Sequence, residues 1–191
     1  LPPRKGLPNI LQNQRGNAVS NLSSTRALRD VAVRYGASYT PSAVGEVNVV
    51  TKMKETGAII GGEGNGGVIY PAAHYGRDAL VGIALILTYL AKKHMKLSQL
   101  RASYPNYVIT KNRIDLKPEM NIDAILDSVK KHYSNEKITD IDGVKIDFPT
   151  SWVHLRRSNT EPIIRVYSEA STEEEANKLA EEVIEQVKSM V

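Results

Sequence analysis

The segment at residues 61–67 surrounds one acidic side chain, Glu63, with five glycines. Glycine adopts backbone conformations that other residues avoid, and it lets the chain approach a ligand closely. A carboxylate held there could accept hydrogen bonds from two neighbouring hydroxyl groups, each contributing roughly 1.5–3 kcal/mol because the acceptor is charged. Such chemistry is typical of a sugar-binding loop. A flexible turn that binds nothing is the alternative.

The same segment matches the Gly-x-Gly-x-x-Gly dinucleotide fingerprint at Gly62, Gly64 and Gly67. That fingerprint needs a helix to begin at its last glycine. Here residues 68–71, Val-Ile-Tyr-Pro, follow instead, and their pattern is extended and ends in proline. The context therefore disfavours a dinucleotide site.

A second polar segment, Arg-Arg-Ser-Asn-Thr-Glu-Pro at residues 156–162, joins two predicted antiparallel strands, and Arg165 follows it. Backbone N–H groups in a tight turn form a concave anion-binding site, and arginine can bind phosphate through two parallel hydrogen bonds. The combination of hydroxyls, amides and guanidinium groups suits a tetrahedral dianion. An ordinary polar hairpin with solvated arginines is the alternative.

Other candidate residues carry weaker signals. Residues 140–143, Asp-Ile-Asp-Gly, resemble the start of a cation loop, but no further carboxylates follow at coordinating spacing, so a turn is favoured. His74, beside Tyr75 and Arg77, could line the Glu63 site, cap a helix or lie at the surface. We assign no catalytic residue and no metal ligand.

Composition narrows the class of protein. The chain has 191 residues, 41% hydrophobic and 24% charged, which is ordinary globular usage and argues against bulk disorder. It has no cysteine, which excludes disulfides, thiolate zinc sites, iron–sulfur clusters and a cysteine nucleophile. The net charge of +4 mildly favours anionic partners, but no basic stripe is interleaved with aromatics, so nucleic acid is not an expected partner.

No segment predicts insertion into a membrane. The longest apolar run, residues 79–91, is shorter than the roughly 20 residues needed to span a bilayer. We expect a cytoplasmic protein with no membrane partner. The chain begins at Leu1 with no initiator methionine or signal-peptide pattern, so we expect it to be part of a longer polypeptide.

The first part of the chain alternates strands with helices, which is typical of parallel crossover units. Ser23 or Ser24 is expected to cap the first helix, and Pro41 to end the second strand. After a proline-rich tail at residues 1–10, the expected strands are 18–22, 38–40 and 58–61, and the expected helices are 27–35, 47–55 and 77–94.

The second part reads as strand, helix, strands and helix. Ser171 and Glu174 form a capping-box pattern before the last helix, and Pro118 is expected to open the other. Expected strands are 107–110, 144–148, 151–156 and 163–169. We therefore predict a three-layer α/β domain with a mainly parallel sheet at residues 1–100, then a smaller α+β domain with an antiparallel sheet and two helices at 101–191.

Taken together, these segments resemble the α-D-phosphohexomutases, which include phosphoglucomutase, phosphomannomutase and phosphoglucosamine mutase. The resemblance extends from about Gly16 to the end of the chain. It rests on the order of the segments at residues 23–28, 44–45, 62–67, 142–145, 156–162 and 165–167.

The resemblance implies the third and fourth domains of a four-domain enzyme. The N-terminal half would hold the catalytic phosphoserine and the Mg²⁺ ligands, and this half alone would be inactive. The enzyme would interconvert hexose 1-phosphate and 6-phosphate through a hexose bisphosphate. By resemblance, Glu63 and Asn65 would hold sugar hydroxyls, and the phosphate that is not transferred would be held by Arg156, Ser158, Asn159 and Thr160.

Four positions depart from the family pattern. Many members have serine in place of Asn65, histidine in place of Gly67, histidine in place of Glu46 and proline in place of Arg157. The hexose preference among glucose, mannose and glucosamine is therefore left open. A stand-alone phosphosugar-binding module without catalysis is the alternative function, and a basic nucleic-acid-binding protein is a third.

Overall fold

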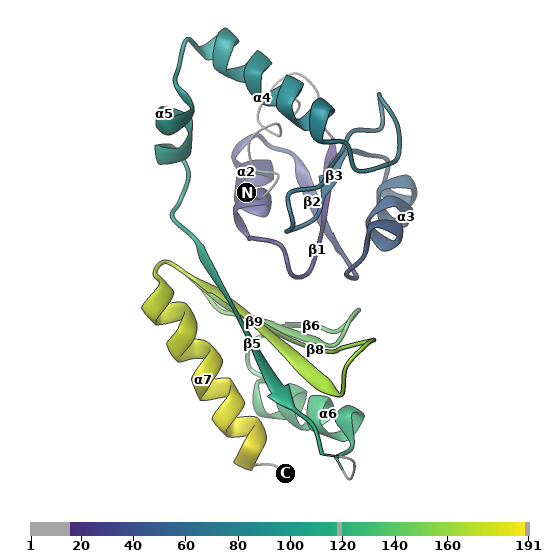
Figure 1. Cartoon of the computed structure of the whole chain (residues 1–191), viewed down its shortest axis with the longest axis vertical. Coiled ribbons are helices and arrows are strands. Elements are labelled where there is room, and N and C mark those ends of the chain that lie inside the picture. The colour runs from purple at the N-terminus through teal and green to yellow at the C-terminus, as the bar shows by residue number, and fades with distance from the viewer. Residues whose placement is uncertain (1–15, 118–119, 190–191) are drawn as a thin grey trace. The chain divides into compact units, whose positions relative to one another are not determined.

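The computed structural model describes residues 16–117 and 120–189 and divides the chain into two compact units, Leu1–Pro105 and Asn106–Val191 (Figure 1). The expected tail at residues 1–10 and the helix start expected at Pro118 lie outside the described residues. The division falls a few residues beyond the expected boundary at residue 100. A short helix that the sequence reading did not predict, α5 (Leu97–Ala102), lies within the first unit.

The first unit has a mainly parallel sheet, as predicted, with one strand more than the three expected. Its strands are β1 (Asn17–Asn21), β2 (Ser38–Ser42), β3 (Ala58–Gly62) and β4 (Val68–Ile69), in the order β2-β1-β3-β4. Strands β2 and β3 pair with β1 in parallel, and β4 pairs with β3 antiparallel. Pro41 does not end β2, because a proline that lacks an N–H is tolerated in an edge strand.

Helices cover both faces of this sheet, which confirms the three-layer arrangement. They are α2 (Ala27–Arg34), α3 (Glu46–Thr56) and α4 (Ala79–Lys93), together with α5. One core joins α2, α4 and α5 to the sheet through Ala18, Leu28, Ile60, Val68 and Tyr89, among others. A second core joins α3 to the other face through Val19, Val49, Met53, Ala58 and Ile69.

The expected cap of α2 is wrong. The helix begins after Arg26 and has no side-chain cap. Ser24 instead donates its hydroxyl to Oδ1 of Asn21 at 2.8 Å, at the end of β1. The hydroxyl of Ser24 therefore stabilises the turn that follows β1 rather than the start of the helix.

The second unit is an all-antiparallel sheet with two helices, as predicted (Figure 1). Both helices pack on the same face of the sheet. Its strands run in the order β5-β9-β8-β7-β6. In chain order its elements are β5 (Val108–Asp115), α6 (Ile122–His132), β6 (Lys137–Thr139), β7 (Val144–Asp147), β8 (Trp152–Arg157), β9 (Ile163–Ala170) and α7 (Glu173–Ser189).

Both helices of this unit begin at capping residues that the sequence reading did not select. Asn121 accepts from the N–H of Ala124 at 3.1 Å at the start of α6. Thr172, rather than Ser171, accepts from the N–H of Glu175 at 3.2 Å at the start of α7. In the described ranges, no helix is long and apolar enough to cross a bilayer.

Leu155 belongs to the hydrophobic core of the second unit and is fully buried. We expect Leu155→Ala to lower the free energy of unfolding by about 2–5 kcal/mol, because the change removes apolar contacts and leaves a cavity. Urea titration followed by circular dichroism measures this loss. Ile141→Ala, at a residue 51% exposed, is the control and should change stability by less than about 0.5 kcal/mol. Equal losses in the two variants would contradict this packing.

Candidate functional site

The glycine-rich loop begins at the carboxyl end of β3, where parallel sheets place their ligands. The N–H of Glu63 donates to the carbonyl of Gly67 at 3.0 Å, and the N–H of Gly66 donates back to the carbonyl of Glu63 at 3.2 Å. Gly66 has a φ of 99°. At Gly64, an added Cβ would lie 3.0 Å from the carbonyl oxygen of Ser23. The loop is thus a hydrogen-bonded turn packed closely against the segment that follows β1.

The carboxylate of Glu63 is held by donors from three separate segments. The side chain is buried, and its Oε1 accepts from Nδ2 of Asn21 at 3.2 Å. Its Oε2 lies 3.3 Å from Nη1 of Arg77 and 3.4 Å from Nδ2 of Asn65. A carboxylate offers about four acceptor positions. These three contacts leave one acceptor position of the carboxylate for a further donor such as a hydroxyl group.

Asn65 orders the loop itself. Its Oδ1 accepts from the N–H of Gly67 at 3.0 Å, while its amide nitrogen faces Glu63. The structure thus brings the two expected sugar-binding residues, Glu63 and Asn65, into one hydrogen-bonded pair.

Arg77 and Glu46 extend this site, and the sequence reading missed their role. Nε of Arg77 donates to Oε2 of Glu46 at 2.8 Å, and the N–H of Arg77 donates to Oε1 at 3.1 Å. Both hydrogen bonds lower the pKa of the Glu46 carboxyl, and the one from the backbone N–H has the larger effect. Glu46 therefore stays ionised near neutral pH. Two features of the sequence pointed to these residues. Glu46 stands where many family members have histidine, and Arg77 lies close to His74 in the chain.

His74 lies in the segment between β4 and α4. Its Nε2 lies 3.0 Å from Oδ2 of Asp78, and Asp78 caps the helix by accepting from the N–H of Val81 at 3.0 Å. The hydrogen bond with His74 lowers the pKa of the Asp78 carboxyl. Of the roles considered for His74, the geometry matches that of a residue supporting a helix cap.

The second loop joins β8 to β9 and is organised around the buried hydroxyl of Ser158. This hydroxyl lies 3.5 Å from both the hydroxyl and the N–H of Thr160, and Nη2 of Arg165 donates to it at 3.4 Å. Arg165 also donates to Oε2 of Glu161 at 2.9 Å. A backbone hydrogen bond of 3.0 Å from Ser158 to Ile163 closes the base of the loop.

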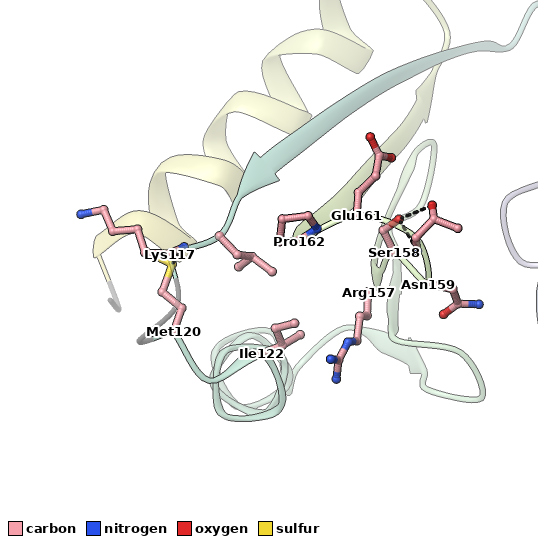
Figure 2. A pocket seen from close by; sticks show the side chains of 10 residues that line it. Lys117, Met120, Ile122, Arg157, Ser158, Asn159, Glu161 and Pro162 are labelled. Carbon is pink, nitrogen blue, oxygen red and sulfur yellow. Dashed lines mark hydrogen bonds between the residues drawn. The ribbon is translucent and has the colours of Figure 1, made fainter.

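A hollow of about 670 Å³ opens beside this loop (Figure 2). Figure 2 shows Lys117 and Arg157 on either side of the apolar side chains of Met120 and Ile122. The hollow is lined by the loop and by the segment between β5 and α6: Leu116, Lys117, Met120, Ile122, Arg157, Ser158, Asn159, Thr160, Glu161 and Pro162. Three of the four expected phosphate-binding residues, Ser158, Asn159 and Thr160, are among them.

Arg156, the fourth expected residue, lies apart from that lining. Successive residues of a strand point to opposite faces, so Arg156 and Arg157 diverge. Arg156 is paired in register with Arg165 of β9, and its Nη1 lies 4.0 Å from Oδ2 of Asp142. The two neighbouring arginines thus flank the base of the loop from opposite faces of the sheet.

No group of three or more histidine, aspartate or glutamate side chains gathers in the described ranges where a metal ion could bind.

Two consecutive family profiles match this arrangement. Phosphoglucomutase/phosphomannomutase, alpha/beta/alpha domain III matches residues 8–107, and the phosphoglucomutase/phosphomannomutase C-terminal domain matches residues 112–186. The chain belongs to the phosphoglucomutase/phosphomannomutase family. The two matches follow each other in the domain order expected from the sequence.

Curated family members resemble the chain over most of its length. It is 35% identical to the phosphoglucosamine/phosphogalactosamine mutase of Sulfurisphaera tokodaii, covering 86% of this chain and 37% of that protein. It is 38% identical to the phosphoglucomutase/phosphomannomutase of Thermococcus kodakarensis, covering 90% of this chain and 38% of that protein. The chain therefore spans less than two fifths of the length of these two relatives.

Solved structures of family members share the fold. A Burkholderia thailandensis family protein matches 97% of this chain and 42% of its own, with a TM-score of 0.75 and 21% identity. The N-acetylphosphoglucosamine mutase of Aspergillus fumigatus, solved with glucose 1,6-bisphosphate, matches 98% of this chain and 43% of its own, with a TM-score of 0.67 and 15% identity.

A buried histidine next to Arg156 makes the stability of this family member depend on pH. His154 is 1% exposed, and its Nε2 lies 2.7 Å from the carbonyl oxygen of Asp142. Burial lowers the pKa of His154 from 6.5 to about 4; the charge of Lys145 also lowers it, while the hydrogen bond to Asp142 opposes the shift. The unfolded chain therefore binds a proton at a higher pH than the folded chain does.

The stability contributed by neutral His154 is complete above pH 6.5 and is lost as the pH falls toward 4. We expect His154→Gln to reduce the loss of unfolding free energy between pH 7 and pH 4 by about 3 kcal/mol, measured by urea titration at each pH. If the free energy of unfolding depends on pH identically in wild type and variant, His154 has the same pKa in the folded and unfolded chains.

Proposed function

We propose that these 191 residues are the sugar- and phosphate-binding half of a phosphohexomutase, which interconverts hexose 1-phosphates and 6-phosphates through a hexose bisphosphate. The observation that carries the proposal is the match of family domains III and IV in consecutive order. The mutase names of the relatives from Sulfurisphaera and Thermococcus support the same activity.

In this proposal, Glu63 and Asn65 hold the hydroxyl groups of the sugar. The Glu63 carboxylate is buried and fixed by Asn21 through a 3.2 Å hydrogen bond, so it offers a defined acceptor. The 3.4 Å bond from Asn65 is the longest of its contacts. A sugar hydroxyl would displace that amide most readily, and the freed amide could donate to a second sugar oxygen.

The loop between β8 and β9 would hold the phosphate that is not being transferred, through Arg156, Ser158, Asn159 and Thr160. The Ser158 and Thr160 groups lie within 3.5 Å of one another and are spaced to share an oxyanion. Phosphoryl transfer depends mainly on positioning and charge stabilisation, and a loop that fixes the remote phosphate serves both needs.

The remaining chemistry would belong to an N-terminal half that completes the enzyme. It would contribute the phosphoserine and the Mg²⁺ ligands, so the 191 residues alone would be inactive. The N-acetylphosphoglucosamine mutase of Aspergillus fumigatus was solved with GlcNAc-6P and magnesium. The alternative is a phosphosugar-binding module without catalysis. The cytoplasmic location stays a prediction.

Turnover distinguishes the mutase from the binding module. We expect the natural chain, with all residues that precede these 191, to convert glucose, mannose or glucosamine 1-phosphate to the 6-phosphate in the presence of Mg²⁺. The 191 residues alone should give no turnover. Turnover by these 191 residues alone would refute the proposal that the catalytic groups lie in the N-terminal half. Absence of turnover in both the natural chain and the 191 residues would favour the binding module.

Two neighbouring arginines test the phosphate assignment. In the natural chain, Arg156→Ala should raise the KM for hexose 1-phosphate about 10- to 100-fold, because a charge-assisted hydrogen bond to phosphate is lost. Arg157→Ala removes the same charge one residue away and should raise it less than about threefold. A larger increase in KM for Arg157→Ala than for Arg156→Ala would show that Arg157, which lines the hollow, binds the phosphate instead. Arg34→Ala, at an exposed position of α2, controls for the change in net charge.

Glu63 is expected to govern discrimination between sugars. Glu63→Gln keeps the size of the side chain and removes its charge, so hydrogen bonds from sugar hydroxyls weaken. We expect the ratio of kcat/KM between hexose phosphates that differ at one hydroxyl group to fall about tenfold or more. An unchanged ratio would show that Glu63 does not contact the hydroxyl groups compared.

A further inference from the structure

Arg77 occupies the space that a side chain at position 67 would need. The backbone of Gly67 is outside the left-handed region, so its conformation does not require glycine. A Cβ built there would lie 2.5 Å from Cδ and 2.9 Å from Cγ of Arg77, closer than real Cβ atoms approach other atoms. The stem of Arg77, rather than the backbone, is therefore what excludes a larger residue.

The guanidinium at the end of that stem connects two carboxylates from different elements. Its Nε donates to Glu46 at the start of α3, and its Nη1 lies 3.3 Å from Oε2 of Glu63. The side chain of Glu63 is 7% exposed, whereas those of Glu46 and Arg77 are 35% and 44% exposed. A buried carboxylate is costly unless it is paired. Arg77 is the cation that meets this need, and Glu46 fixes its orientation.

We propose that Arg77 is a positioning residue for Glu63, that Glu46 orients it, and that position 67 is glycine because only glycine leaves room for it. The proposal deepens the proposed function, since it assigns the residue that fixes the sugar-hydroxyl acceptor. Arg77 would thereby determine how sharply the site distinguishes sugars that differ at one hydroxyl.

A double-mutant cycle on the 191-residue chain tests the steric part without any ligand. Gly67→Ala should lower the urea midpoint of unfolding by about 0.5–1 M, because overpacking typically costs 1–3 kcal/mol. In the Arg77→Ala background, at least half of that loss should disappear, since the space is then free. In the Arg77→Lys background the loss should persist, since lysine keeps the Cγ and Cδ atoms.

Gly36→Ala is the matched control for this cycle. Gly36 has a φ of +64° and no atom within 4 Å of an added Cβ, so its cost comes from the backbone alone. Its loss should be the same with or without Arg77. If the losses from Gly67→Ala and Arg77→Ala are also additive, the steric coupling is wrong and the proposal fails.

The positioning role is read from kinetics of the natural chain that contains these residues. We compare kcat/KM for glucose 1-phosphate with that for its 3-deoxy and 4-deoxy analogues. Arg77→Ala should lower kcat/KM for the parent sugar about tenfold or more and leave an analogue lacking the Glu63-bound hydroxyl nearly unchanged. Arg77→Lys should restore part of the discrimination, because it keeps the charge but lacks the fork that connects two carboxylates.

The outcomes separate the two hypotheses. If wild type does not distinguish the deoxy analogues while the stability cycle shows coupling, the sugar-binding role of Glu63 fails and the structural pairing stands. If wild type distinguishes them and Arg77→Ala slows all three sugars equally, Arg77 supports the fold without positioning Glu63, and the proposal is overturned.

Discussion

The buried carboxylate of Glu63 is the group on which the geometry of the first unit's site depends. Removing an ionised carboxylate from water costs several kcal/mol unless donors replace the lost hydration. Those donors come from Asn21 at the end of β1, Asn65 in the loop and Arg77 before α4. The need to satisfy one charge therefore fixes the relative positions of three chain segments. It also leaves the carboxylate as a rigid acceptor, which is what recognition of hydroxyl groups requires.

The second unit solves a different problem, because its candidate ligand is an anion. Here the alternation of a strand decides which side chains are available. Arg156 and Arg157 project to opposite faces of β8, and Arg165 on β9 is paired with the former. At the turn, Nη2 of Arg165 donates to the hydroxyl of Ser158. Positive charge thus reaches the loop from both faces of the sheet, although only Arg157 lines the hollow.

The two sites share a feature that suits enzymes whose work is positioning. Both consist of hydrogen-bonding groups held on short loops between well-packed elements. Phosphoryl transfer gains most from orientation and charge stabilisation. The chain belongs to the phosphoglucomutase/phosphomannomutase family and covers less than two fifths of the two relatives compared.

The sequence by itself determined the fold class, most of the elements and the two loops, because hydrophobic periodicity and glycine or proline signals act over a few residues. It missed the short elements α5 and β6. It misplaced local caps: Ser24 bonds to Asn21, and Thr172 takes the place expected of Ser171. Several nearby hydroxyls can serve a helix end, and the local turn geometry decides which of them does so.

Only the tertiary structure decided which charges meet. Glu46 and Arg77 are 31 residues apart and became partners because α3 and the segment before α4 bring them together. The structure also shows that Gly67 leaves room for the side chain of Arg77. The spacing of residues in the sequence gives no indication of this contact. Local patterns fix where the chain turns, but a contact between distant side chains exists only once the packed elements have set their separation.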